Sequence, residues 1–138
     1  MKKILFTIIC LVLVLASLSS CASIDSYIEN LENHGDFEVT KIRRDDEIDE
    51  IAAMVHLDPK DYGVKEIVYG HSGNSGVAIG VVIVECGSKS KAKNLEKEVD
   101  EIVEYMKSLY PSNMYPISYE REGKFLIVGS DMAIDAAK

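Results

Sequence analysis

The segment VAIGVVIVE, Val77–Glu85, is the most apolar stretch of the chain after its first 20 residues. It is rich in β-branched residues, which favour strands, and it is shorter than an ordinary buried helix. A strand that is covered on both faces has a continuous apolar sequence instead of an alternating one. The segment therefore predicts the central strand of a sheet.

The neighbouring segment Val64–Tyr69 is also β-branched and aromatic, and it predicts a second strand. Between the two lies the glycine-rich sequence Gly70–Gly76. Glycines between two apolar runs are typical of a hairpin connection. A third strand is expected at Asp36–Ile42, and a second hairpin at Ile117–Arg121 and Lys124–Gly129.

Helices are predicted between these strands from apolar residues spaced three and four positions apart. The first has its apolar stripe at Ile24–Leu31, with Ser23 as N-cap and Gly35 as C-cap, and we expect this stripe to pack on the domain core. A second, Asp46–Leu57, begins with acidic residues and is expected to end because of Pro59. The longest is Ser88–Tyr110, and Ser130 caps a short helix at the C-terminus.

This order predicts an α+β fold, a two-layer sandwich in which an antiparallel sheet carries helices on one face. We place Asp46–Leu57 and Ser88–Tyr110 together on that face. The β-α-β-β-α-β order resembles ferredoxin-like domains with an extra hairpin strand. Such folds host many unrelated functions, so the architecture predicts no activity.

The N-terminus has the organisation of a secretory signal. Met1-Lys2-Lys3 is basic, and Ile4–Leu15 is almost entirely apolar but short for a membrane span. Leu18-Ser19-Ser20-Cys21 resembles the lipobox of bacterial lipoproteins. The resemblance implies cleavage before Cys21, a thioether-linked diacylglyceryl group on its sulfur, and export. We therefore expect a signal peptide at 1–20, a lipidated N-terminus with a short amphipathic helix at 21–35, and one α+β domain at 36–138.

The resemblance also implies a location, because two acyl chains hold a protein stably at a bilayer. We expect the mature protein on the extracytoplasmic face of the cell membrane. The arrangement resembles small single-domain lipoproteins of low-GC Gram-positive bacteria; in a Gram-negative bacterium, Ala22 would imply transfer to the outer membrane. The alternative is a conventional signal cleaved near Ala22 and a freely secreted protein.

The charge of the mature chain limits its partners. Without Lys2 and Lys3, 13 basic and 23 acidic residues remain, a formal charge of 13 − 23 = −10. Such a surface repels nucleic acid and anionic headgroups, so no nucleic-acid partner is expected and membrane attachment should come from the lipid. Cys10 leaves with the signal and Cys21 carries lipid, so Cys86 has no disulfide partner within the chain. We interpret it as a small buried residue.

One stretch raises the question of catalysis. Gly70-His71-Ser72-Gly73-Asn74 resembles the G-x-S-x-G motif of serine hydrolases, but asparagine stands at the last glycine and a strand follows instead of a helix. No histidine occurs after His71. A hairpin turn is the preferred interpretation, and a small serine hydrolase using His71 and Ser72 is the alternative. His56 and His71 lack a third metal ligand, and no metal or cofactor is expected.

A group of aromatic and amide side chains is the candidate surface for a ligand or partner. Its members are Tyr105, Tyr110, Asn113, Tyr115 and Tyr119. Aromatic rings beside an amide suit glycans or peptides, although they also complete half-buried sheet edges. The sequence thus predicts a non-catalytic binding module of the cell envelope, with a protein, cell-wall or small-molecule partner. A purely structural envelope subunit is a further alternative.

Overall fold

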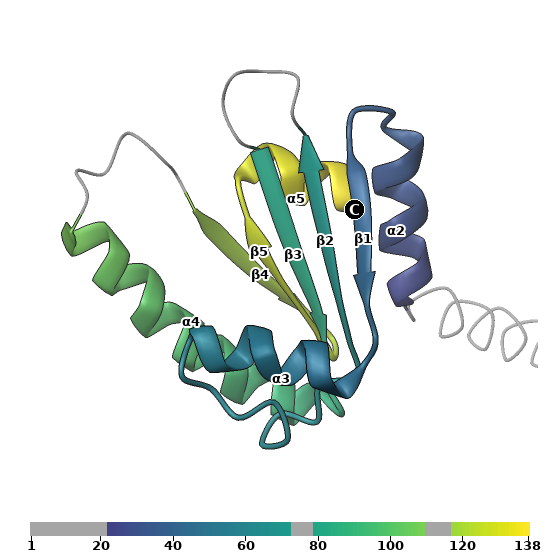
Figure 1. Cartoon of the computed structure of the whole chain (residues 1–138). Coiled ribbons are helices and arrows are strands. Elements are labelled where there is room, and N and C mark those ends of the chain that lie inside the picture. Colours follow the sequence, from purple (N-terminus) through teal and green to yellow (C-terminus); the bar gives the residue numbers. More distant parts are fainter. Residues whose placement is uncertain (1–21, 73–78, 110–116) are drawn as a thin grey trace, which may run out of the picture.

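The computed structural model describes residues 22–72, 79–109 and 117–138 and shows a mixed α+β fold (Figure 1). Its strands form one five-stranded sheet of order β1-β2-β3-β5-β4, in which every neighbouring pair is antiparallel. The strands are β1 Glu38–Ile42, β2 Glu66–Ser72, β3 Ile79–Glu85, β4 Ser118–Glu122 and β5 Phe125–Gly129. The predicted fold class is therefore confirmed.

The central position of β3 is also confirmed, since β2 and β5 pair with its two edges. Ser72 pairs with Ile79, so β2 and β3 form the predicted hairpin. Val81 and Ile83 are fully buried on one face, while Val82 and Val84 are half-buried on the other. The continuous apolar run thus supplies both faces of the sheet from one strand.

The order of elements along the sequence is the predicted one, but only half of the sheet has the ferredoxin-like arrangement. In a split β-α-β unit another strand lies between the two strands that the helix connects. Helix α4 (Lys89–Leu109) connects β3 and β4 in this way, with β5 between them, whereas β1 and β2 are direct antiparallel neighbours, with Thr40 opposite Tyr69. Helix α3, Asp45–Met54, therefore connects two neighbouring strands, and no strand lies between β1 and β2.

One face of the sheet, here called the closed face, is covered by α2 (Ile24–Asn33) and α5 (Asp131–Ala137). The predicted stripe of α2 packs there, as expected: Ile24, Tyr27, Ile28 and Leu31 are all buried against the sheet. Gly70 allows this close approach, since a Cβ atom there would lie 3.0 Å from Leu31 Cδ1. The sheet side chains of this core are Val68, Val81, Ile83, Phe125 and Ile127.

Helix α4, Lys89–Leu109, lies on the opposite face, mainly over β5 and β4. Its Ala92 and Leu95 pack with Leu126 and Cys86 in a second, smaller cluster. The prediction that the helices share one face was therefore wrong for α2 and α5. The physical reason is that the apolar runs of β3 and β5 are continuous, so both faces of the sheet are apolar and each needs cover.

Helix α3 ends at Met54, three residues before the predicted end at Leu57. The helix is therefore already complete before Pro59, which was expected to end it. The N–H of His56 donates to Ala53 O at 3.2 Å, and the N–H of Leu57 donates to Ala52 O at 3.0 Å. These two bonds are those of a Schellman motif. Its left-handed residue is His56, with φ of 58° in the place that glycine usually occupies. Backbone capping, not proline, ends this helix.

Candidate functional site

The face opposite the closed face is covered only in part. In β2, Val68, Gly70 and Ser72 are buried, whereas Tyr69 is 40% exposed and His71 is half-buried. Side chains alternate across a strand, so Tyr69 and His71 point away from the closed face. Tyr69 pairs with Val82 of β3, which is also half-buried. We call Tyr69, His71 and Val82 the open sheet face.

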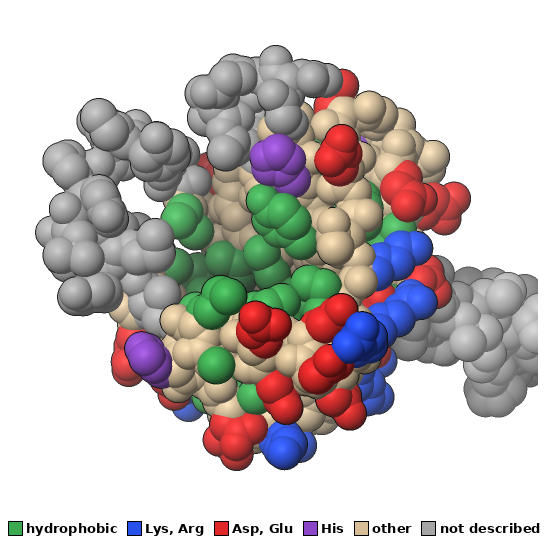
Figure 2. Space-filling view, in the orientation of Figure 1, with side chains coloured by type: hydrophobic (Ala, Val, Ile, Leu, Met, Phe, Trp, Pro, Cys, Tyr) green, Lys and Arg blue, Asp and Glu red, His purple; other side chains and the backbone are tan. Residues whose placement is uncertain are grey.

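Further hydrophobic side chains are exposed at the end of α3. Met54 is 73% exposed and Val55, the C-cap, is 45% exposed. Figure 2 shows a hollow over the middle of the sheet with hydrophobic side chains along its floor and along its α3 border. Exposed apolar side chains that gather around a concave surface are typical of an interaction site.

Helix α4 covers the remaining part of the same face, and polar contacts join it to β4. The Tyr119 hydroxyl donates to Asp100 Oδ1 at 2.6 Å, and Arg121 Nε donates to Glu96 Oε2 at 2.8 Å. Tyr119 also packs against the small cluster beneath α4. These contacts bind the helix over β5 and β4 and leave the open sheet face beside it.

The α3 border is strongly acidic. Asp45, Asp46, Glu47, Asp49 and Glu50 all lie in this helix, and its segment contains no lysine or arginine. Arg44, just before it, forms ion pairs with Asp46 and, at 3.6 Å, with Glu47. The hydrogen bond from Arg44 lowers the pKa of Asp46, so this carboxylate stays charged. Figure 2 shows acidic side chains over α3 next to the hollow.

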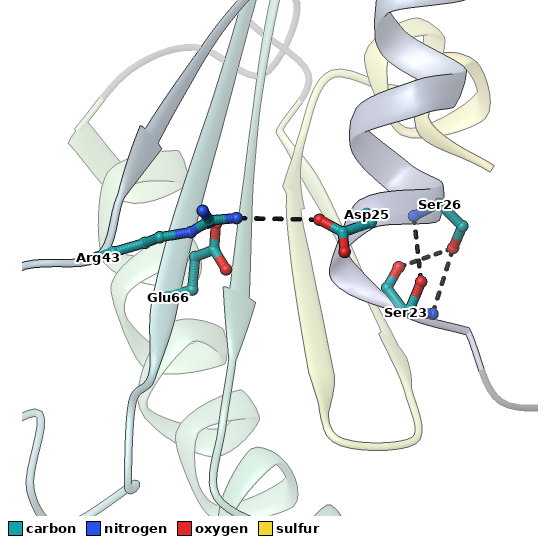
Figure 3. A network of polar contacts seen from close by, with 5 residues as sticks. All are labelled: Ser23, Asp25, Ser26, Arg43 and Glu66. Atoms are coloured by element: carbon teal, nitrogen blue, oxygen red, sulfur yellow. Dashed lines mark hydrogen bonds and ion pairs between the residues drawn. The ribbon is translucent and has the colours of Figure 1, made fainter.

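The start of α2 forms the other feature of interest, because it follows the expected anchor directly. Ser23 and Ser26 form a reciprocal capping box: each backbone N–H donates to the other's hydroxyl, at 3.2 and 3.3 Å (Figure 3). This arrangement satisfies N–H groups that would otherwise lack partners in the first turn. Helix α2 is therefore well formed from its first residue.

An ion-pair network connects this first turn to the sheet. Arg43, after β1, donates through Nε to Glu66 Oε1 at 2.7 Å and lies 3.8 Å from Asp25 of α2 (Figure 3). Glu66 is buried, and its hydrogen bond raises the pKa of Arg43. A buried carboxylate is stable when a cation and a hydrogen bond satisfy it, as Arg43 does for Glu66, whereas the exposed pair with Asp25 adds little to the placement of α2.

Most of the sequence-predicted sites fall outside the described residues. Cys21, Tyr110, Asn113 and Tyr115 all do, and Tyr105 belongs to α4 without a described side chain. Tyr119 is half-buried and hydrogen-bonded to α4, which is the position expected of a residue completing a sheet edge.

His71 and Ser72 do not form a nucleophile elbow. They are consecutive residues of β2, so their side chains point to opposite faces of the sheet. Ser72 is buried on the closed face, while His71 stacks on Tyr69 with ring centroids 6.1 Å apart. A hydrolase needs its serine and histidine within hydrogen-bond reach, and this geometry separates them. The two strands do form the predicted hairpin, but the expected connection began too early, because Gly70, His71 and Ser72 are residues of β2.

Cys86 is fully buried beneath α4, as predicted from its place after an apolar strand. Burial raises the pKa of its thiol from 9.0 to about 11, so the protonated form prevails at neutral pH. Within the described ranges, no group of three metal-ligating side chains comes together. No described helix has the length and apolar character needed to cross a membrane.

Comparisons of the chain with protein-family models, curated proteins and solved structures gave no match. The open sheet face was missed in the sequence because its residues come from two different strands, β2 and β3. A weak signal was present in β2, where Ile67, Tyr69 and His71 alternate with Val68 and Gly70. That alternation indicates that one face of the strand is buried and the other is partly exposed to solvent.

Proposed function

We propose that this protein is a lipid-anchored extracytoplasmic binding module that contacts another protein of the cell envelope through its open sheet face. The observation that carries the proposal is a hollow over the middle of the sheet with hydrophobic side chains along its floor and its α3 border, on a face where Tyr69 is 40% exposed. Burial of such side chains by a partner removes apolar area from water, at about 25 cal/mol per Å². Aromatic residues and methionine are also enriched at protein interfaces.

The lipobox supports the membrane anchor, and the fold adds a consequence. Only Ala22 separates Cys21 from Ser23, the N-cap of α2. Each residue extends the chain by about 3.6 Å at most, so a lipid on Cys21 leaves almost no tether between bilayer and domain. Because α2 is part of the core, the whole domain is held close to the membrane surface. The expected partner is a membrane-proximal protein.

Mass spectrometry of the protein extracted from membranes tests the anchor. We expect a mature N-terminus at Cys21 carrying a diacylglyceryl group, and Cys21→Ser should remove that group from the protein. Cys10→Ser, in the leader, is the matched control and should leave the modification intact. An unmodified N-terminus near Ala22 in the culture medium would refute the anchor.

Ser72→Ala separates binding from the hydrolase alternative. If the protein is a binding module, the Ser72→Ala variant should keep the affinity of the unmodified protein for its partner. No ester- or amide-cleaving activity should be lost with the substitution. The substitution removes one small hydroxyl at the end of β2, so the fold should tolerate it. A cleaving activity that disappears in Ser72→Ala would establish the hydrolase instead.

A further inference from the structure

We infer that the open sheet face binds a cationic amphipathic segment of a protein partner, with apolar side chains in the hollow and basic side chains along α3. The inference rests on the proposed function for its cellular setting. Its chemistry comes from the surface itself: the apolar floor around Tyr69 and Val82 and the acidic border of α3.

The apolar part of the surface can accept side chains of different shapes. Met54 is unbranched and flexible, and such residues adapt to irregular partners. Tyr69 offers an aromatic ring that is 40% exposed and stacks on His71. A rigid ring beside an adaptable methionine is a favourable combination for the apolar stripe of a helix lying in a groove.

The negative charge of the α3 border favours a partner with positive charge. Five carboxylates lie in α3 and one guanidinium, that of Arg44, pairs with two of them. Glu47, Glu50 and Met54 lie three, four and seven positions apart and so share one side of the helix. A partner with lysine or arginine beside its apolar residues meets this side favourably, whereas an anionic membrane surface is repelled.

The test uses the full-length protein in phosphatidylcholine nanodiscs and a fluorescent peptide of leucine and lysine at helical spacing, about four turns long. Binding is measured at low salt as the rise in the fluorescence anisotropy of the peptide, after the rise seen with empty nanodiscs is subtracted. We expect the peptide to bind, and a leucine–glutamate peptide of the same length to bind at least about tenfold more weakly. Added salt should weaken the binding, because the attraction is partly between exposed charges.

Two pairs of variants locate the site. Met54→Ser should weaken binding of the leucine–lysine peptide by about threefold to tenfold, the loss expected from part of one methionine side chain. Met132→Ser is its control, since Met132 is 63% exposed on α5, across the sheet. Glu50→Lys should weaken binding and reduce its salt dependence, while Glu29→Lys on α2 should do neither. All four side chains are exposed, so the fold should be preserved.

The inference is overturned if the lysine and glutamate peptides bind equally, if neither binds above empty nanodiscs, or if Met132→Ser weakens binding as much as Met54→Ser. Binding that tracks the lipid content of the nanodiscs and ignores every variant would assign the peptide to the bilayer instead. These outcomes are independent of the anchor, because an N-terminus without lipid refutes the proposed location while peptide binding can still be measured.

Discussion

The two faces of the sheet are built from the same strands and yet differ in how they are covered. On the closed face, Val81 and Ile83 of β3 have no exposed surface and pack under α2 and α5. On the other face, Val82 and Tyr69 keep part of their surface in water, because α4 covers mainly β5 and β4. The closed face therefore supplies most of the stability, and the open sheet face is free to change its contacts.

The largest effect is expected from breaking the closed face at α2. Leu31 is fully buried and contacts the sheet beside Gly70. Leu31→Ala should lower the free energy of unfolding by about 3–4 kcal/mol, from lost apolar burial and the cavity left behind. Chemical denaturation measures this change. Met132→Ala, at an exposed position of α5, should cost less than about 0.5 kcal/mol; a similar cost for both variants would contradict the assignment of the core.

Adjacent valines of β3 give a direct comparison of the two faces. Val81→Ala should cost about 2–3 kcal/mol, because two carbon atoms leave a closed core. Val82→Ala makes the same chemical change on the open sheet face and should cost less than about 1 kcal/mol. Denaturation of both variants under one set of conditions measures the difference. Equal losses would mean that the open sheet face is as well packed as the closed one.

An effect that is absent at neutral pH concerns the part of the same side that α4 covers. Burial raises the pKa of Cys86 from 9.0 to about 11, so the folded protein retains its thiol proton at pH values where the unfolded chain loses it. Stability from this group is therefore complete below pH 9 and declines as the pH rises toward 11. Cys86→Ala should show a shallower loss of stability over that interval and little pH-dependent difference at neutral pH. Identical slopes above pH 9 would show that the thiol is not buried under α4.

Much of the fold could be predicted because local patterns are strong in this chain. The run Val77–Glu85 indicated a central strand, and Ser23 and Ser130 marked the starts of α2 and α5 correctly. The end of α3 could not be predicted from Pro59, because a histidine in a left-handed conformation is stabilised there by backbone hydrogen bonds. The sheet order was also beyond sequence reasoning, since several orders satisfy the same apolar pattern.

The candidate site was predicted less well than the fold. Tyrosines near the end of the long helix were chosen as a cluster from their proximity in sequence. Within the part of the chain that the structure describes, Tyr119 instead completes the edge of the sheet beside α4. Tyr69 was not chosen, although it is the aromatic residue most exposed on the sheet among those described. Exposure depends on which helix lies over a strand, and neighbouring sequence does not contain that information.

The sequence by itself determined the resemblance to a lipoprotein signal, the acidic charge, the apolar strands and the amphipathic stripe of α2. Each of these is a property of residues close together in the chain. Only the tertiary structure decided that α2 and α5 cover one face, that α4 leaves part of the other uncovered, and that acidic α3 borders that surface. Those facts depend on packing between distant segments, where small differences in buried area select one arrangement among several that fit the same local pattern.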